Sequence, residues 1–473
     1  MLGFRSRRTR GRGPERLEVQ TPSARSSPAR GARGAALTAL GAALSCAGTF
    51  AAAETLQSIR DGSAADSGVI AGAVASSEAG RDQPQPTPRL SDAAIDPLRR
   101  ELIEIAFQSA TRIPLDPHVK DRAKTQEAVV IAALRADQPL LAARFANPIP
   151  GWRRGNAYAA LAFDAIERGF PAEARQYLAI AAEVAEREPE EWRRDRIRAG
   201  MARTYVLLGE EETARRFAID LETAEIGKTE AALARVADEA RFERLLEWCE
   251  QAAATRSVDM TRNAMEVLSG LVDRFHDDPE RRRMAEEMIR RSWNPLPILM
   301  RVEVLEGLAE IAKRRGDRMK LVALTEELNA FSRDYEWLPE DRILIRSRVA
   351  AFRSAAGERE RAASELEALL AAFDAERHLI GMVFRAAVVR AIAEAMTVTD
   401  DMARAAEIYH RAIDVAVENV NLRPRAEDLA AIAGSIAVHV PRPDATLVER
   451  LRSEHDRLVP PAVAASGAAA PSP

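Results

Sequence analysis

Cysteine, aromatic residues and lysine are all scarce in this chain. Cys46 and Cys249 are the two cysteines among 473 residues. Cys46 lies in an apolar N-terminal segment that we expect to be removed, so the mature chain is expected to have no internal disulfide. Cys249 lies in a helical context, where a buried and inert thiol is expected. Aromatic residues make up only 5% of the chain, against 47% hydrophobic residues overall.

The apolar content comes largely from Ala and Leu, which are strong helix formers, as are Glu and Arg. This composition predicts an all-α protein. Only five of the 68 basic residues are lysine, and the net charge is -4. Residues 1–34 contain nine Arg and two Glu, so the chain from Glu54 onward carries about -11. This net negative charge argues against nucleic-acid binding, which needs a net basic surface.

Catalytic signatures are absent from the sequence. It contains no phosphate-binding glycine loop, no dinucleotide fingerprint and no Gly-x-Ser-x-Gly elbow. The six histidines are scattered, with no His-x-x-x-His pair to hold a metal ion. We therefore assign no catalytic residue, metal site or cofactor, and expect a protein that is not an enzyme.

The N-terminus has the pattern of an export signal. An uncharged apolar run at 35–47 follows Arg30 and Arg33 and precedes three alanines at 51–53. This pattern predicts a secretory signal peptide over 1–53, with a long basic region and cleavage after Ala53. The apolar run is too short to span a membrane comfortably, although an uncleaved anchor is the alternative. The protein is expected in the periplasm or outside a bacterial cell, with no membrane span in the mature chain.

Two segments flank a body of helical character. Residues 54–91 are rich in Ser, Ala, Gly, Asp and Pro, and residues 459–473 are rich in Pro, Ala, Ser and Gly. Such compositions predict a flexible linker and a disordered tail. The folded part is then expected over 92–458.

An internal repeat indicates how the body folds. Trp152-Arg153-Arg154 recurs forty residues later as Trp192-Arg193-Arg194, and each block continues to a glycine and a second helical pattern. Related turns are expected near 137, 169, 209, 240, 277, 316, 357 and 400. The spacing predicts an α-solenoid of about eight stacked antiparallel helix hairpins.

These blocks resemble tetratricopeptide repeats. The first block has Leu161, Ala162, Gly169, Ala174, Leu178 and Ala181 where that family has its large, small and turn residues; blocks around Met201, Ala350 and Ala393 match less completely. Small residues at these places let the two helices approach closely, and large ones fill the gap to the next hairpin. Glycine permits the positive φ that ends the first helix.

The resemblance implies a binding groove lined by the first helix of each hairpin, which takes peptide or protein partners. Carried onto this chain, the groove positions are Asn156, Phe163, Arg196, Arg203, Glu303, Glu310, Arg390 and Glu394. A non-catalytic scaffold of the cell envelope is the function this favours. The alternative is an envelope-processing or peptidoglycan-associated enzyme factor built on a helical superhelix. The sequence leaves the oligomeric state open.

Two smaller features have competing interpretations. Trp152, Trp192, Trp293 and Trp337 each lie near a proline between consecutive repeats. They are expected to pack between repeats, although a ligand-binding ridge is the alternative. His276 beside two aspartates could suggest a metal site, but Asp278 before Pro279 is typical of a helix N-cap.

Overall fold

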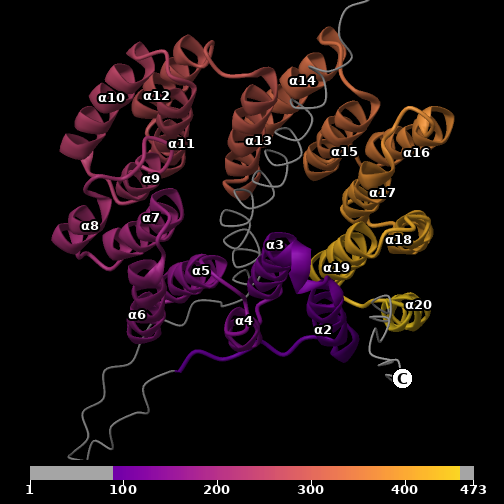
Figure 1. Cartoon of the computed structure of the whole chain (residues 1–473). Helices are drawn as coiled ribbons and strands as arrows, with labels where there is room; N and C mark the ends of the chain where they lie inside the picture. The colour runs from indigo at the N-terminus through magenta and orange to yellow at the C-terminus, as the bar shows by residue number, and fades with distance from the viewer. Residues whose placement is uncertain (1–88, 459–473) are drawn as a thin grey trace, which may run out of the picture. The chain divides into compact units, whose positions relative to one another are not determined.

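The computed structural model describes residues 89–458. The expectations for the signal peptide over 1–53, its cleavage, the C-terminal tail and nearly all of the linker lie outside these residues. Every element of the described part is a helix, as the composition predicts (Figure 1). In chain order the helices are α2 (Pro97–Arg112), α3 (Leu115–Arg135), α4 (Pro139–Ala146), α5 (Arg153–Glu167), α6 (Pro171–Arg187), α7 (Glu191–Leu207), α8 (Glu211–Ala218), α9 (Gly227–Arg235), α10 (Glu239–Ala254), α11 (Val258–Arg274), α12 (Pro279–Ser292), α13 (Ile298–Arg314), α14 (Arg318–Asp334), α15 (Pro339–Ala355), α16 (Arg359–Glu376), α17 (Met382–Thr397), α18 (Met402–Val417), α19 (Leu422–His439) and α20 (Ala445–Asp456).

The helices alternate between an inner and an outer layer. The odd-numbered helices α3 to α19 pack side by side, each against the next odd-numbered one, and the even-numbered helices lie outside them (Figure 1). Short turns reverse the chain after every helix, so all the inner helices run in the same direction. The described chain is thus an α-solenoid of stacked hairpins, with turns at each of the eight places expected from the repeat.

Left-handed residues end most of the inner helices. Gly169, Gly209, Gly316 and Gly357 have φ between +69° and +96° at the turns that follow α5, α7, α13 and α15. At Gly169 the next amide, Phe170 N–H, donates to Ala165 O at 2.8 Å, which is the 6→1 bond of a Schellman motif. The turn after α17, expected near 400, uses Asp400 at φ +69° in place of a glycine.

Small residues bring neighbouring inner helices close together. A Cβ added at Gly200 of α7 would lie 3.0 Å from the Ala159 Cβ of α5, and one added at Gly270 of α11 would lie 3.1 Å from the Ala234 Cβ of α9. The alanine methyl groups lie against the glycine backbone, so these positions leave no room for a larger side chain. The repeat pattern predicts such an approach between the two helices of one hairpin, whereas these contacts join inner helices of successive hairpins.

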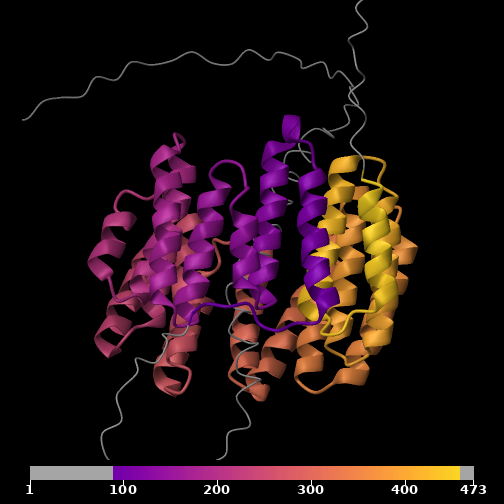
Figure 2. The same cartoon turned by 90° about the horizontal axis from the view of Figure 1, so that it is seen from below.

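The solenoid closes on itself, which the sequence pattern did not reveal. The first described helix, α2, packs along α19 and takes the outer position of its hairpin, and α3 packs against both α2 and α19. Figures 1 and 2 show the indigo start of the described chain beside its yellow end. The nine inner helices of the described part therefore form a closed ring.

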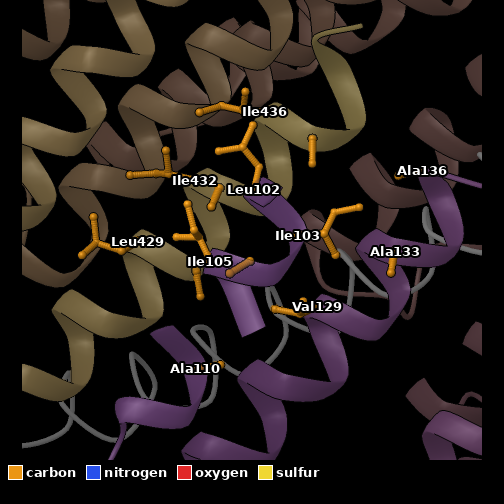
Figure 3. Close-up of a cluster of buried hydrophobic side chains, with 14 of the residues drawn as sticks. Leu102, Ile103, Ile105, Ala110, Val129, Ala133, Ala136, Leu429, Ile432 and Ile436 are labelled. Atoms are coloured by element: carbon orange, nitrogen blue, oxygen red, sulfur yellow. The ribbon is translucent and has the colours of Figure 1, made fainter. Parts of the chain in front are cut away.

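A continuous hydrophobic core fills this junction. Leu102 and Ile103 of α2 and Leu429, Ile432 and Ile436 of α19 are almost completely buried (Figure 3). Polar contacts reinforce it from α20, because Ser109 Oγ lies 3.0 Å from His455 Nδ1. Residues about 340 positions apart in the sequence thus share one core.

One hairpin departs from the pattern. Helix α9 makes few contacts with α10 and packs mainly between α7 and α11, while α10 pairs with α11. This irregular pair lies at the turn near 240, where the sequence has no glycine. Among residues 89–458, no helix is long and apolar enough to cross a membrane.

The tryptophans at the repeat junctions take part in packing. Trp152 meets Trp192 edge-on, with ring centroids 5.4 Å apart, and Trp293 meets Phe331 at 6.0 Å. Trp337 Nε1 donates to Phe331 O at 3.0 Å. Asp278 accepts hydrogen bonds from the amides of Glu280 and Arg281, so it is the N-cap of α12.

Candidate functional site: the inner face of the ring

Ionisable side chains from every inner helix gather on the side of the ring that faces its centre. We call this the inner face. Its charges interact between helices that do not pack together: the guanidinium of Arg135 on α3 interacts with the carboxylates of Glu310 on α13 and Glu394 on α17. The members are half-buried, apart from the more deeply buried Glu127, and are Glu127, Arg135, Glu167, Arg196, Arg203, Lys228, Arg235, Arg262, Glu266, Glu303, Glu306, Glu310, Lys313, Arg348, Arg390, Glu394, Asp428 and His439.

Helix α13 contributes three carboxylates at helical spacing. Glu303, Glu306 and Glu310 lie at i, i+3 and i+7, so they share one face of the helix. Glu310 pairs with Lys313 at 3.2 Å, and Glu306 pairs with Arg348 of α15 at 2.6 Å. For Glu303, burial and the neighbouring Glu306 raise the carboxyl pKa to about 7, against the opposing effect of nearby arginines.

A second carboxylate of this kind lies on α11. Burial raises the pKa of Glu266 to about 7, although Arg262, at 3.5 Å, and Lys228 of α9 act in the opposite direction. Lys228 itself forms an ion pair with Glu225. Protonation of Glu266 and Glu303 near neutral pH would change the charge on this side of the inner face.

Helices α7 and α9 carry the cationic side. The Arg203 guanidinium lies 3.4 Å from the ring centroid of Phe163 on α5, and that of Arg235 lies 5.4 Å from the same ring. Arg235 also pairs with Glu167 at 2.8 Å. Arg196 lies 5.8 Å from the ring of Trp152. Cations held over aromatic rings in this way are suited to carboxylate or aromatic groups of a ligand.

Helices α17, α19 and α3 form a mixed-sign group. Burial would raise the pKa of Glu394, but its ion pair with Arg390 and the nearby His439 hold that pKa below its usual value. Burial lowers the pKa of Arg135 to about 10 and that of His439 below its normal range. Asp428 shows the opposite effect to Glu394, since burial raises its pKa to about 7.

The structure places the residues expected from the repeat pattern on inner helices. Arg390 and Glu394 form an ion pair with each other, and Phe163 and Arg203 are in contact. Asn156 donates from Nδ2 to Glu127 Oε1 at 2.8 Å. Glu303 and Glu310 lie on the acidic face of α13, and Arg196 lies on α7.

Sequence reasoning missed other members of this face. Arg135, Glu266, Arg348, Asp428 and His439 belong to it as well. Glu306 also belongs to this face; it lies one turn from Glu303 on α13, so it could have been found by extending the helical spacing of that helix. His439 and Asp428 lie on α19, the helix whose hairpin is completed by α2, so no local repeat pointed to them.

A shallow cavity of about 530 Å³ lies outside this face, at the C-terminal end of α2. Phe107, Ile113 and Pro114 line it together with Arg122 and His455. Its lining is mostly apolar, and its histidine already bonds Ser109. Among the described residues, no group of three His, Cys, Asp or Glu side chains could hold a metal ion.

No protein-family model matches the chain, and no curated protein matches it. One similar solved structure is described as a circular tandem repeat protein with novel repeat topology and enhanced subunit contact surfaces; it is 14% identical, with 76% of this chain and 94% of that chain covered and a TM-score of 0.25. That score is low, so the evidence for the ring is the contacts of α2 with α19 and α20 and of α3 with α19, at the two ends of the described residues. The chain is a helical-repeat protein of the α-solenoid class.

Proposed function

We propose that this protein is a non-catalytic scaffold of the cell envelope that binds a segment of a partner protein or peptide at the inner face. The observation that carries the proposal is the recurrence of partly accessible charged side chains on each inner helix. An interaction face repeated around a solenoid is what extended polypeptide ligands use in helical-repeat proteins. The resemblance to tetratricopeptide repeats supports the same ligand class.

The distribution of charge on the inner face favours a polypeptide ligand over a small ion that carries charge of one sign. Cations on α7 and α9 and carboxylates on α11 and α13 occupy different parts of the face, and Phe163 lies among the cations. A peptide with both acidic and basic side chains complements such a face along its length. Electrostatic complementarity of this kind confers specificity more than raw affinity.

The proposal is tested by capture of partners from a bacterial cell-envelope extract. The variant Arg196→Glu/Arg203→Glu reverses two inner cations and should lose the captured partners. The matched control Arg187→Glu/Arg283→Glu reverses two exposed cations on the outer helices α6 and α12 and should retain them. Circular dichroism of all three proteins checks that the helices remain folded. Unchanged capture by the inner variant would reject the inner face as the binding site.

The compartment is tested separately. We propose export through the segment at 1–53, so the mature protein should begin at Glu54. Mass spectrometry of the N-terminus of protein recovered from the envelope fraction measures this. An intact Met1 terminus on a chain found only in the cytoplasm would contradict the proposal.

A further inference from the structure

One rim of the ring carries most of its exposed apolar side chains. Because all inner helices run the same way, every connection from an outer helix to the next inner helix lies at the same rim. We call this the N-terminal rim and define it as residues 113–118, 147–156, 188–194, 219–230, 255–261, 293–301, 335–342, 377–385 and 418–425. Its large side chains with at least 37% exposure are Leu115, Trp192, Ile219, Val258, Tyr335, Leu338, Leu379, Met382, Val383 and Val420.

The opposite rim differs in two respects. Its exposed apolar side chains are fewer: Leu140, Val236, Met319, Val398 and Met402. The helices that start there are often capped by aspartate, as at Asp238, Asp278, Asp317, Asp401 and Asp444. At the N-terminal rim, by contrast, Ser257 is the one N-cap side chain of the described inner helices that accepts a hydrogen bond from the helix. The N-terminal rim thus offers apolar groups and amide donors together, which marks an interaction surface.

The charge of this rim indicates what covers it. Its nine segments contain 12 Arg and Lys and 13 Asp and Glu, so it is nearly neutral overall. The charges are nevertheless separated along the ring. The segment 219–230, before and into α9, has four carboxylates against Lys228, whereas the segment 377–385, before and into α17, has Arg377 and Arg385 and no carboxylate. A nearly neutral surface with separated charges is a poor match for an anionic membrane but can complement itself.

We propose that the N-terminal rim is the contact surface between two copies of this chain, stacked rim to rim about a two-fold axis. The axis lies in the plane between the two rings and passes through α13 on one side and between α3 and α5 on the other. The acidic segment 219–230 of each copy then faces the basic segment 377–385 of the other. The same operation places α7 opposite α19 and α11 opposite α15. The interface is isologous, so each favourable contact occurs twice.

Apolar contacts coincide with the charged ones in this arrangement. Leu379 is 60% exposed and Met382 is 46% exposed in the basic segment, and Ile219 is 56% exposed in the acidic one. Stacking buries all three while it brings opposite charges together. The inner face as defined above shares only Lys228 with this rim, so this inference does not depend on the proposed function.

Sedimentation velocity of the whole protein tests the proposal. The single chain of 473 residues has a mass of 51.8 kDa. We expect the mass to rise toward twice the single-chain value over the micromolar range. The variant Leu379→Glu/Met382→Glu should weaken self-association by about tenfold or more, since it removes apolar contacts and adds negative charge opposite an acidic segment. The matched control Met319→Glu/Met402→Glu, on the opposite rim, should associate like the unmodified protein.

A charge exchange makes the test specific to the pairing. Glu222→Arg and Arg377→Glu should each weaken self-association, and the double variant should restore it, because the segments that contain them face each other in the proposed dimer. A single-chain mass up to about 100 µM, or equal association of the rim variant, would overturn the proposal. Binding to phosphatidylserine vesicles without self-association would also overturn it and assign the rim to a membrane surface.

Discussion

The guanidinium of Arg99, near the start of α2, donates a hydrogen bond of 2.8 Å to the main-chain oxygen of Ala437, near the end of α19. The two residues are 338 positions apart. Arg452 of α20 and Glu101 of α2 add an ion pair at the same junction. An ordinary solenoid needs polar terminal repeats to cover its two ends. Here each end covers the other.

The apolar part of this junction can be tested by truncating one buried side chain. Leu102→Ala should lower the free energy of unfolding by about 2–5 kcal/mol, because a fully buried leucine leaves a cavity. Urea denaturation measures the loss. Leu140→Ala, where the side chain is 46% exposed, should change the stability by less than about 0.5 kcal/mol.

Coupling between the two ends is the sharper form of this test. Leu102 and Ile432 belong to the same core, so the losses in Leu102→Ala and Ile432→Ala should not add in the double variant. Strict additivity would indicate that the two ends do not meet.

The two acidic residues Glu303 and Glu394 should affect stability with opposite pH dependence. The pKa of Glu303 is raised from its ordinary 4.5 to about 7, so the folded state binds its proton more tightly than the unfolded state. The contribution of the protonated Glu303 carboxyl to the stability of the fold is fully present below about pH 4.5 and is lost as the pH rises to about 7. Glu303→Gln should therefore raise the melting temperature at pH 8 and change it little at pH 4.5.

Glu394 is the matched comparison. Its pKa is lowered, so the charged form is favoured in the folded state and its contribution is lost as the pH falls. Glu394→Gln should lower the melting temperature at pH 8. Thermal melts by circular dichroism between pH 4.5 and 8 measure both variants, and parallel curves for the two would contradict the assignment.

Two glycines should respond to alanine in opposite directions. Gly169 has φ +82° and no atom within 4 Å of an added Cβ, so alanine there introduces backbone strain alone and should cost about 1 kcal/mol. Gly307 lies inside α13, with equally open space and an ordinary helical conformation. Gly307→Ala should stabilise the protein by about 0.5–1 kcal/mol. Denaturation midpoints of the two variants provide the comparison.

Arg353 on α15 tests how adjacent hairpins are joined. Its side chain is 1% exposed and bonds Glu326 of α14 at 2.7 Å and Glu365 of α16. Arg353→Ala should lower the free energy of unfolding by about 2–4 kcal/mol through the lost bonds and the cavity. Arg361, 54% exposed, contacts the same two glutamates, and Arg361→Ala should have an effect below about 0.5 kcal/mol. Similar losses in both would show that Arg353 does not join the hairpins.

Cys249 provides a probe of the native core. Burial raises the pKa of its thiol far above the usual range, and the side chain is fully covered. A thiol reagent should therefore label the folded protein negligibly and the urea-unfolded protein completely, as measured by mass spectrometry. Rapid labelling under native conditions would contradict the burial.

Much of the local architecture follows from the sequence. The glycines at 169, 209, 316 and 357 predict the turns because each takes a left-handed conformation, and Asp278 predicts a helix start because its carboxylate accepts two amides. Such features depend on neighbouring residues only, and a single sequence displays them.

Closure of the ring could not be predicted in the same way. It depends on small rotations between successive hairpins, which add up around the nine inner helices. The pairing of α2 with α19 joins two helices that share no repeat pattern. For the same reason the repeat pattern located Asn156 and Glu394 but not His439, whose surroundings exist only once the ring is complete.

The way the ring closes imposes an order on its formation. Helix α2 is the first of the described helices to be synthesised, yet Leu102 and Ile103 pack in one core with α19, which is synthesised about 330 residues later. A ribosome at 5–20 residues per second takes tens of seconds to cover that distance. Until α19 is synthesised, the apolar face of α2 that packs against it lacks its partner helix, and α3 is the neighbour available to α2.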